Sequence, residues 1–540
     1  VWKKRGNTSK ATSKVPTWGP ILRCLFGQAT FSGLSLTLDI MGDINKIFGP
    51  PGTGKTTYLL NVVDSELLSG TLPISIGYFS FTRKAANEAR DRAIAKFPTL
   101  NARTDFPYFR TLHSLAFRCL GTRTDDIMQP AHYKEFAAEA GIQLDLTKDE
   151  ELGFVKADNP ILNEVNLARI KGLDLREHYN MSALDIEWRH FEFVERTYRH
   201  YKHSRNLLDF TDLLEMIVDE PSRLPSLDVL IVDEAQDLSR LQWLMVEALS
   251  ERAKRTYLAG DDDQAVFTWA GADVKSFLSF QGKITVLDQS YRVPTKVHTL
   301  ANSIVRQIRE RQSKTWKSRD VEGNVKTYYR HEDVDISQGQ WLIMASTNYL
   351  LNPVHEWLKG MGILFERNGI PSLSPQIAGA VVNWERLRQG KAISGEQVAT
   401  IYRYLDASAV ARGHKTFRSG EKDELYDMDS LKRNFGLLID TVWHEALSKI
   451  SLETQEYLIA LLRRGVKLNQ APRIRLSTIH GAKGGEADNV LLLMDLSPKF
   501  AKEYARNPDN VHRLFYVGIT RAKQSLHLVL PRHIEKGFRI

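Results

Sequence analysis

The feature that most constrains the fold is a glycine-rich octapeptide, Gly49-Pro50-Pro51-Gly52-Thr53-Gly54-Lys55-Thr56. It follows a short segment, 44–48, that predicts a strand, and it precedes a pattern that predicts a helix from Lys55 onward. Glycines let backbone N–H groups curl around phosphate oxygens, and a helix N-terminus adds a positive dipole end. The sequence therefore predicts a P-loop for ATP, in which Lys55 reaches the β- and γ-phosphates and Thr56 ligates Mg²⁺. A chance glycine-rich turn is disfavoured because both flanking elements are present.

A second acidic element supports this prediction. Residues 228–232 read as a buried strand that delivers Asp233 and Glu234 at its carboxyl end, where ligand sites of α/β folds lie. We expect Asp233 to hold Mg²⁺ and Glu234 to accept a proton from the attacking water. An Asp-Glu pair alone is usually a solvated turn, but downstream of a complete P-loop it indicates nucleotide hydrolysis.

Composition sets looser bounds. The 540 residues are too many for one ordinary core, so we expect two to four domains. The net charge of +8 fits a nucleic-acid partner only weakly. No stretch reaches the roughly 20 apolar residues of a membrane span, and no membrane partner is expected. The two cysteines suit a reducing compartment, so we expect a cytoplasmic location, or the nucleoid or host cytoplasm for a phage-encoded chain.

Alternating strand and helix patterns predict a parallel α/β architecture. We expect a first core in 41–119 and 205–290, interrupted by a helical insertion at 120–204. A second core is expected in 291–390 and 471–540, interrupted by a short helical insertion at 391–470. Within the first insertion, four aromatic or apolar residues share a helical face and are interpreted as core: Phe191, Val194, Tyr198 and Tyr201.

The N-terminal segment 1–40 is a basic extension, and the first methionine is Met41. Its Ser/Thr-rich, acid-free start resembles a transit peptide. We favour a simpler interpretation, in which translation begins at Met41 and residues 1–40 are upstream sequence.

Further motifs follow the P-loop in a fixed order. They are Phe81-Thr82-Arg83-Lys84-Ala85-Ala86-Asn87-Glu88, Thr111-Leu112-His113-Ser114, Asp233-Glu234-Ala235-Gln236-Asp237, Gly260-Asp261-Asp262-Asp263-Gln264, Gln289-Ser290-Tyr291-Arg292, Thr478-Ile479-His480-Gly481-Ala482-Lys483-Gly484-Gly485-Glu486 and Leu514-Phe515-Tyr516-Val517-Gly518-Ile519-Thr520-Arg521-Ala522. In this order they resemble the UvrD/Rep/PcrA family of superfamily 1 DNA helicases. The resemblance implies two RecA-like P-loop NTPase cores with parallel sheets, each interrupted by a mainly helical insertion. It also implies ATP-driven movement along single-stranded DNA with 3′ to 5′ polarity, and duplex junctions as substrates; it names no protein partner.

The resemblance also assigns roles at the nucleotide. Arg292 and Arg521 would reach the γ-phosphate from the second core, which suits arginine because its planar fork binds phosphate oxygens bidentately. Gln264 would sense the γ-phosphate, Tyr291 would stack on adenine, and Glu486 would bond the ribose.

Single-stranded DNA needs a different surface. The resemblance places Phe267 and Trp269 beside the single-stranded DNA, where stacking of a base on an aromatic ring contributes ~1–3 kcal/mol. Weaker candidates for the same groove are Phe81, Thr82, His113 and His480.

Some positions depart from the family pattern. The glutamine that reads adenine upstream of the P-loop has no clear equivalent, and Thr57 stands where an arginine often helps to sandwich the base. Ala270 replaces an arginine after the motif III tryptophan, and Gly485-Glu486-Ala487 replaces a common Leu-Glu-Phe. These changes affect adenine recognition and coupling rather than phosphate chemistry, so selectivity for ATP over GTP stays open.

Three alternatives remain open from the sequence. The chain could be a translocase that strips proteins from DNA without unwinding it. It could be an ATP-dependent switch or loading module. RNA could be the track, although the motifs resemble the DNA-tracking branch.

Overall fold

The computed structural model describes residues 42–149, 154–182, 184–414 and 422–540. The basic extension 1–40 and the expected start at Met41 lie outside the described residues.

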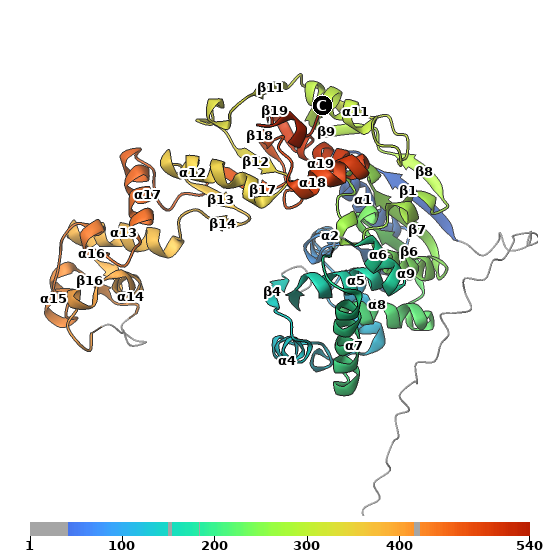
Figure 1. Cartoon of the computed structure of the whole chain (residues 1–540), viewed down its shortest axis with the longest axis horizontal. Coiled ribbons are helices and arrows are strands. Elements are labelled where there is room, and N and C mark those ends of the chain that lie inside the picture. The colour runs from blue at the N-terminus through green and yellow to red at the C-terminus, as the bar shows by residue number, and fades with distance from the viewer. Residues whose placement is uncertain (1–41, 150–153, 183, 415–421) are drawn as a thin grey trace, which may run out of the picture. The chain divides into compact units, whose positions relative to one another are not determined.

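The first core is built on a six-stranded sheet in the order β3-β2-β6-β7-β1-β8. Every pairing in it is parallel. The strands are β1 (Asp43–Phe48), β2 (Ile76–Phe79), β3 (Phe109–Arg110), β6 (Leu227–Val232), β7 (Ala253–Gly260) and β8 (Lys283–Val286). The helices are α1 (Lys55–Leu68), α2 (Arg83–Lys96), α3 (Leu112–Leu120), α8 (Phe210–Asp219), α9 (Arg240–Ser250) and α10 (Val274–Ser279). In Figure 1, β1 lies beside β7, although about 200 residues of chain separate the two strands.

The order of these strands positions the site. β6, β7 and β1 are neighbours and parallel, so the segments after their carboxyl ends meet at one edge of the sheet. Those segments are the P-loop after β1, Asp233 and Glu234 after β6, and Asp261 onward after β7. This is the edge at which open parallel sheets bind ligands.

The first insertion combines helices with a β-hairpin. It contains α4 (Pro130–Ala140), β4 (Asp145–Asp149), β5 (Phe154–Asp158), α5 (Pro160–Lys171), α6 (Leu175–Met181) and α7 (Trp188–Arg205). The four residues interpreted as core from their helical spacing are all buried on α7 and join one apolar cluster, which confirms that interpretation. The hairpin was not predicted.

The second core has a seven-stranded sheet in the order β11-β19-β18-β12-β17-β13-β14. All its pairings are parallel except β13 with β14. The strands are β11 (Asn324–Tyr328), β12 (Trp341–Ala345), β13 (Phe365–Arg367), β14 (Ile370–Pro371), β17 (Ile474–Thr478), β18 (Ala487–Leu493) and β19 (Ala522–Val529). Its helices are α11 (Thr295–Val305), α12 (Asn352–Gly360), α18 (Pro498–Arg506) and α19 (Pro508–Ile519), and a separate parallel pair is formed by β9 (Gln289–Pro294) and β10 (Lys317–Arg319). Two parallel α/β cores confirm the expected fold class.

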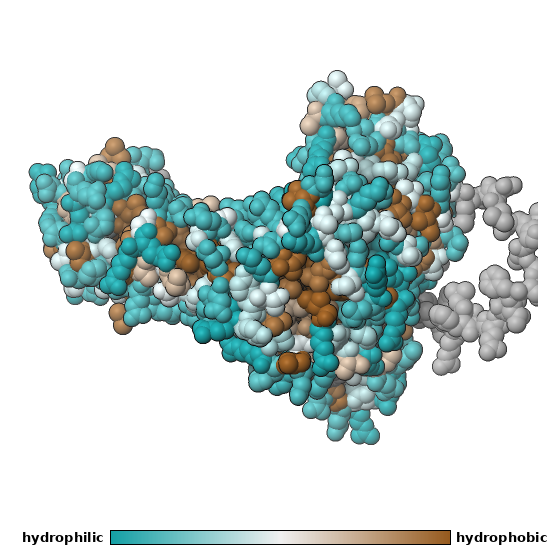
Figure 2. Space-filling view, turned by 90° about the horizontal axis from the view of Figure 1, so that it is seen from above, coloured by the Kyte–Doolittle hydropathy of each residue, from teal (hydrophilic) through white to brown (hydrophobic). Residues whose placement is uncertain are grey.

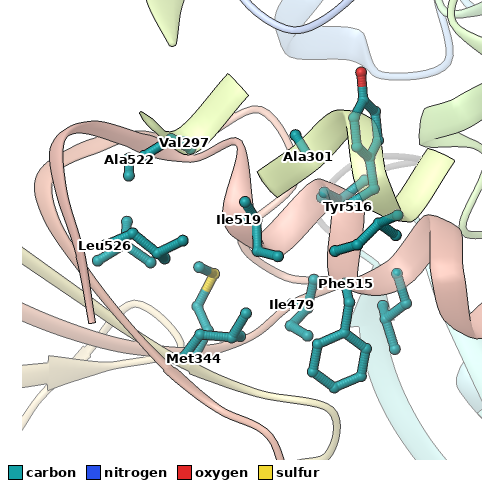
Figure 3. Packing of buried hydrophobic residues seen from close by; sticks show 14 of the residues in the cluster. Val297, Ala301, Met344, Ile479, Phe515, Tyr516, Ile519, Ala522 and Leu526 are labelled. Atoms are coloured by element: carbon teal, nitrogen blue, oxygen red, sulfur yellow. The ribbon is translucent and has the colours of Figure 1, made fainter. Parts of the chain in front are cut away.

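One face of the second sheet is packed by α11 and α19. Figure 3 shows Met344 of β12 between Leu526 of β19 and Ile479, with Ile519 of α19 close by. These side chains are fully buried. Their packing fixes α19, and therefore Arg521 just beyond its end, against the sheet.

The second insertion has its own apolar cluster. It contains α13 (Pro375–Arg388), β15 (Ile393–Ser394), α14 (Gly395–Tyr404), β16 (Leu425–Tyr426), α15 (Met428–Asn434), α16 (Trp443–Ala446) and α17 (Leu452–Arg463). Helix α13 belongs to this cluster through Val381, Trp384 and Leu387. The helices that pack together in the second insertion therefore begin before residue 391, the boundary that we expected from the sequence.

Among the described residues, no helix combines the length and apolar character that crossing a membrane requires. On the face drawn in Figure 2, hydrophilic residues cover most of the surface and hydrophobic residues gather in small groups.

Candidate active site

The P-loop has the backbone conformation expected for a phosphate cradle. Gly52 and Gly54 have φ of 74° and 79°, in the left-handed region that glycine adopts without strain. Gly54 is the N-cap of α1, so the helix begins at Lys55 as predicted. At Gly52 a Cβ atom would lie 2.4 Å from Cβ of Arg292, because the second core approaches the loop closely here.

Hydrogen bonds tie this loop to the start of β9. The Tyr291 amide donates to the Gly52 carbonyl at 2.8 Å, and the Ser290 hydroxyl donates to the Pro51 carbonyl at 2.7 Å. The Thr53 hydroxyl closes the loop internally on the Pro50 carbonyl at 2.8 Å. The P-loop is thus held from both cores.

Two oxygen ligands suited to Mg²⁺ face each other beside the loop. The Thr56 hydroxyl lies 3.4 Å from Oδ2 of Asp233, and the Tyr78 hydroxyl donates to the same oxygen at 3.0 Å. A hydroxyl and a carboxylate are the hard oxygen ligands that Mg²⁺ prefers, so these residues fit the ion. Lys55 Nζ donates to the Gly49 carbonyl at 2.9 Å, which places its ammonium against the first residue of the loop.

Asp233 and Glu234 differ in their electrostatic environment although they are adjacent. Burial, followed by the charge of Glu234, raises the pKa of Asp233. Burial alone would also raise the pKa of Glu234, but the charges of Lys55 and Lys483 outweigh it and lower that pKa. Glu234 has a left-handed backbone with φ of 53°, an uncommon conformation that non-glycine residues keep where the surrounding structure enforces it. An ionised carboxylate held in this way can accept a proton.

Arg521 reaches the first core from the end of α19. Its guanidinium is buried and donates to the Val517 carbonyl at 3.0 Å, to the Gly485 carbonyl at 3.3 Å and to Oε1 of Gln264 at 2.7 Å. Burial, with the nearby charge of Arg292, lowers the pKa of Arg521 to about 9, so it stays cationic at neutral pH. The structure therefore brings together two predicted site residues that are 257 positions apart.

The other predicted residues of the second core lie at the same boundary. Arg292 Nε forms an ion pair with Glu486 at 2.6 Å, and Lys523 lies 3.4 Å from the same carboxylate. Tyr291 has an exposed fraction of 72%, which leaves its ring free to stack on a base. Thr57, on the first turn of α1, is also exposed.

Sequence reasoning assigned no role to Lys483, although it lies inside a quoted motif. Its ammonium forms an ion pair with Asp237 and donates to the Gln264 carbonyl at 2.9 Å. Burial raises the pKa of Asp237 to about 6, the charge of Lys483 lowering it and that of Glu234 raising it. A second cation of the second core is thereby fixed beside Gln264; its only sequence signal was its place in the motif.

An aromatic group lies beside this boundary. Phe81 and Phe267 stack with ring centroids 5.6 Å apart and planes 13° apart. His480 lies 6.1 Å from Phe267 and meets Trp269 edge-on at 6.0 Å. Trp269 has an exposed fraction of 55%. The structure thus gathers four of the six residues predicted to contact DNA, from both cores.

The remaining two residues have different positions. His113, on the first turn of α3, lies edge-on to Phe210 at 6.2 Å and lines a cavity of about 510 Å³ with Phe81, Phe267 and Trp269. The Thr82 hydroxyl accepts from the Ala85 amide at 3.1 Å as the N-cap of α2. Capping accounts for a threonine at this position, so its hydroxyl is engaged in local structure.

A buried charge cluster next to Gln264 was also missed. Asp261, Asp262 and Asp263 follow β7 and share one partner, the ammonium of Lys314. Arg311 adds a bidentate pair with Asp263 at 2.6 and 2.8 Å. Both cations come from the segment between α11 and β10, which carried no motif in the sequence.

Comparison with known proteins agrees with this geometry. Residues 37–285 match the model of the UvrD/REP helicase N-terminal domain, and residues 378–532 match that of the UvrD-like helicase C-terminal domain. The ATP-dependent DNA helicase PcrA of Bacillus subtilis (strain 168) is 25% identical over 337 residues, covering 59% of this chain and 44% of the relative. The same-named protein of Staphylococcus aureus (strain COL) is 26% identical over 313 residues, covering 52% and 40%. The chain spans less than half the length of these curated relatives.

Proposed function

Because this chain belongs to the UvrD/Rep/PcrA family of superfamily 1 helicases, we propose that it is an ATP-dependent motor that moves along single-stranded DNA and separates duplex strands. The observation that carries the proposal is the meeting of both cores at the P-loop: Arg521 of the second core bonds Gln264 of the first. Nucleotide bound there contacts both cores, so its hydrolysis changes how they are held together.

The residues divide the chemistry of hydrolysis among them. Water attacks the γ-phosphorus, the bond from that phosphorus to the ADP oxygen breaks, and Glu234 takes the proton of the water. Lys55, Arg292 and Arg521 supply positive charge to the phosphate oxygens. Thr56 and Asp233 would hold Mg²⁺, which neutralises charge on the phosphates.

The aromatic group supplies the track for DNA. Bases stack on Trp269 and on the Phe81–Phe267 pair, and stacking tolerates any sequence because every base has a π-face. His480 joins this surface to the second core, so movement between the cores is transmitted to the strand. We place this activity in the cytoplasm, where the motor meets ATP and DNA at duplex junctions.

A strand-separation assay tests the proposal. A labelled duplex carries a single-stranded tail on either its 3′ or its 5′ side and is incubated with ATP and Mg²⁺. We expect displacement from the 3′-tailed duplex only, since the family resemblance implies 3′ to 5′ movement. The matched control is Glu234→Gln, which removes the proton acceptor and keeps the shape. Displacement only from the 5′-tailed duplex contradicts the polarity.

The same assay separates the motor from a translocase that does not unwind. A streptavidin block at the 5′ end of a single strand is displaced by either enzyme, because both move toward that end, whereas duplex is separated only by a helicase. Streptavidin displacement without strand separation therefore supports the translocase. Neither result, with ATP turnover unaffected by DNA, supports the switch or loading module.

A further inference from the structure

The buried cluster around Lys314 joins the two cores beside the nucleotide site. Lys314 has a side-chain exposure of 1%, and its ammonium lies 3.0 Å from Oδ1 of Asp261 and 2.9 Å from Oδ2 of Asp263, with Asp262 also in contact. The three carboxylate ligand atoms lie within 4.8 Å of one another. Such a group of negative charges is stable in the interior only if cations neutralise it. Lys314 and Arg311 provide that charge from the second core.

Asp261 carries the influence of this cluster toward the site. Its Oδ1 faces Lys314, while its Oδ2 accepts a 2.7 Å hydrogen bond from Nε2 of Gln264. The other end of the same amide, Oε1, accepts from Nη2 of Arg521 at 2.7 Å. The four side chains therefore form one continuous chain from Lys314 to Arg521 that crosses between the cores twice.

The charges of Asp261 and Arg521, which lie on either side of Gln264, fix the orientation of the Gln264 amide. A flipped amide would set Oε1 against the Asp261 carboxylate and the NH₂ group against the Arg521 guanidinium, and both contacts would be repulsive. Lys314 holds the Asp261 carboxylate in the position that this orientation needs. In the described part of the chain, Arg521 donates three recorded hydrogen bonds. Two go to backbone carbonyls, and Gln264 is the only side chain that accepts one.

We propose that Lys314 is a positioning residue for nucleotide hydrolysis: through Asp261 it orients Gln264, and through Gln264 it holds Arg521 at the cleft. This inference rests on the proposed function, because it assigns Lys314 to the same hydrolytic site. In the part of the chain that the structure describes, the recorded contacts of the Lys314 ammonium are with Asp261, Asp262, Asp263 and the ring of Phe48, all outside the P-loop. Its removal should therefore affect turnover rather than nucleotide binding.

A double-mutant cycle tests this relation. ATP turnover in the presence of single-stranded DNA is measured for the full chain, for Lys314→Met, for Gln264→Ala and for the double variant. We expect Lys314→Met to lower kcat by about 10²-fold, as for displaced catalytic groups, with little change in KM. In the Gln264→Ala background, Lys314→Met should lower kcat no further, because the relay is already broken. A purely structural lysine would instead give losses that multiply.

Two controls isolate the relay. Lys317→Met removes an exposed lysine at the start of β10, whose partner is Asp288, and should leave kcat unchanged. Arg311→Met removes a partly buried cation of the cluster whose recorded hydrogen bonds go to Asp263, so any loss it causes should multiply with that of Gln264→Ala. If Lys314→Met does not fold, as judged by circular dichroism, the near-isosteric Asp261→Asn takes its place with the same expected non-additivity.

The outcomes are distinguishable. If the wild-type protein hydrolyses ATP but the losses from Lys314→Met and Gln264→Ala multiply in the double variant, the inference is overturned and the proposed function stays intact. Full kcat in Lys314→Met overturns it as well. Absence of turnover in the wild-type protein overturns the proposed function and the inference together.

Discussion

Nη2 of Arg521 and Oε1 of Gln264 lie 2.7 Å apart across the boundary between the two cores. Each residue follows an element that its own core packs firmly: Arg521 follows α19, and Gln264 follows β7. The bond is short because both partners are buried and one is charged. In the proposed motor, a change in this contact when nucleotide binds or leaves would link hydrolysis to movement of the cores.

Replacing Arg521 should abolish most turnover while leaving the fold intact. In the proposed site, Arg521→Ala removes positive charge from the γ-phosphate, and an arginine finger of this kind contributes about 10³-fold or more to kcat. Steady-state ATP hydrolysis measures the effect. Arg403→Ala, at an exposed arginine of α14, is the matched control and should retain the wild-type rate. Equal rates for the two variants would contradict the assigned role.

Removing the exposed indole should weaken DNA binding. Trp269→Ala deletes a stacking surface, and the expected loss is ~1–3 kcal/mol of binding free energy, or roughly 5- to 150-fold in Kd. Fluorescence anisotropy with a labelled oligothymidylate measures it. Tyr329→Ala, which removes a tyrosine with an exposed fraction of 83% outside the aromatic group, should bind as the wild type does. An equal loss for both would mean that binding does not depend on this surface.

The first insertion should depend on a buried charge network for its attachment to the core. Lys202 on α7 has a side-chain exposure of 8% and contacts Asp209 and Asp212 at 2.6 Å. Lys202→Met leaves the buried carboxylates of Asp209 and Asp212 with less neutralising charge, so we expect the free energy of unfolding to fall by about 3–5 kcal/mol. Urea denaturation followed by far-ultraviolet circular dichroism measures the free energy of unfolding.

An exposed pair on the same helix provides the comparison for that loss. Arg199 has a side-chain exposure of 71% and pairs with Glu195 at 3.0 Å. Arg199→Met should cost less than about 1 kcal/mol, because solvent screens such pairs. Similar losses for the two variants would show that the buried network contributes nothing special.

His480 should make stability sensitive to acid. Burial, with a smaller effect of the Lys483 charge, lowers the pKa of His480 from 6.5 to about 4. The unfolded chain therefore binds this proton more readily than the folded protein, and the stabilisation present above pH 6.5 is lost as the pH falls toward 4. Between pH 7 and pH 5 the expected loss from this residue is on the order of 2 kcal/mol.

The His480→Phe variant isolates that contribution. Phenylalanine keeps a ring against Phe267, Trp269 and Phe500 but cannot titrate. Its unfolding free energy should fall less than that of the wild type between pH 7 and pH 5. An identical fall in both proteins would assign the acid sensitivity to other groups.

Local motifs allowed much of the fold and site to be predicted. The P-loop, its helix from Lys55 and the strand before Asp233 each depend on a short stretch of sequence, and the structure has all three. The order of motifs, through the family resemblance, assigned Gln264 and Arg521 separately to the γ-phosphate, but the hydrogen bond between them is known only from the structure. Roles at the nucleotide and on DNA stay predictions until they are measured.

Features that depend on distant partners could not be predicted in this way. Lys314 looks like any surface lysine in the sequence, and only the folded chain shows it buried among three aspartates of another core. Lys483 and Asp237 are 246 positions apart. The assignment of α13 to the second insertion follows from the packing of Trp384 and Leu387, because an amphipathic helix does not reveal which core its apolar face joins.

The most direct test of the motor is ATP hydrolysis by the full chain with and without single-stranded DNA, beside the Lys55→Ala variant. We predict that DNA strongly stimulates turnover in the wild type and that Lys55→Ala abolishes it. Turnover that is the same with and without DNA would contradict the motor and leave an ATPase with another purpose.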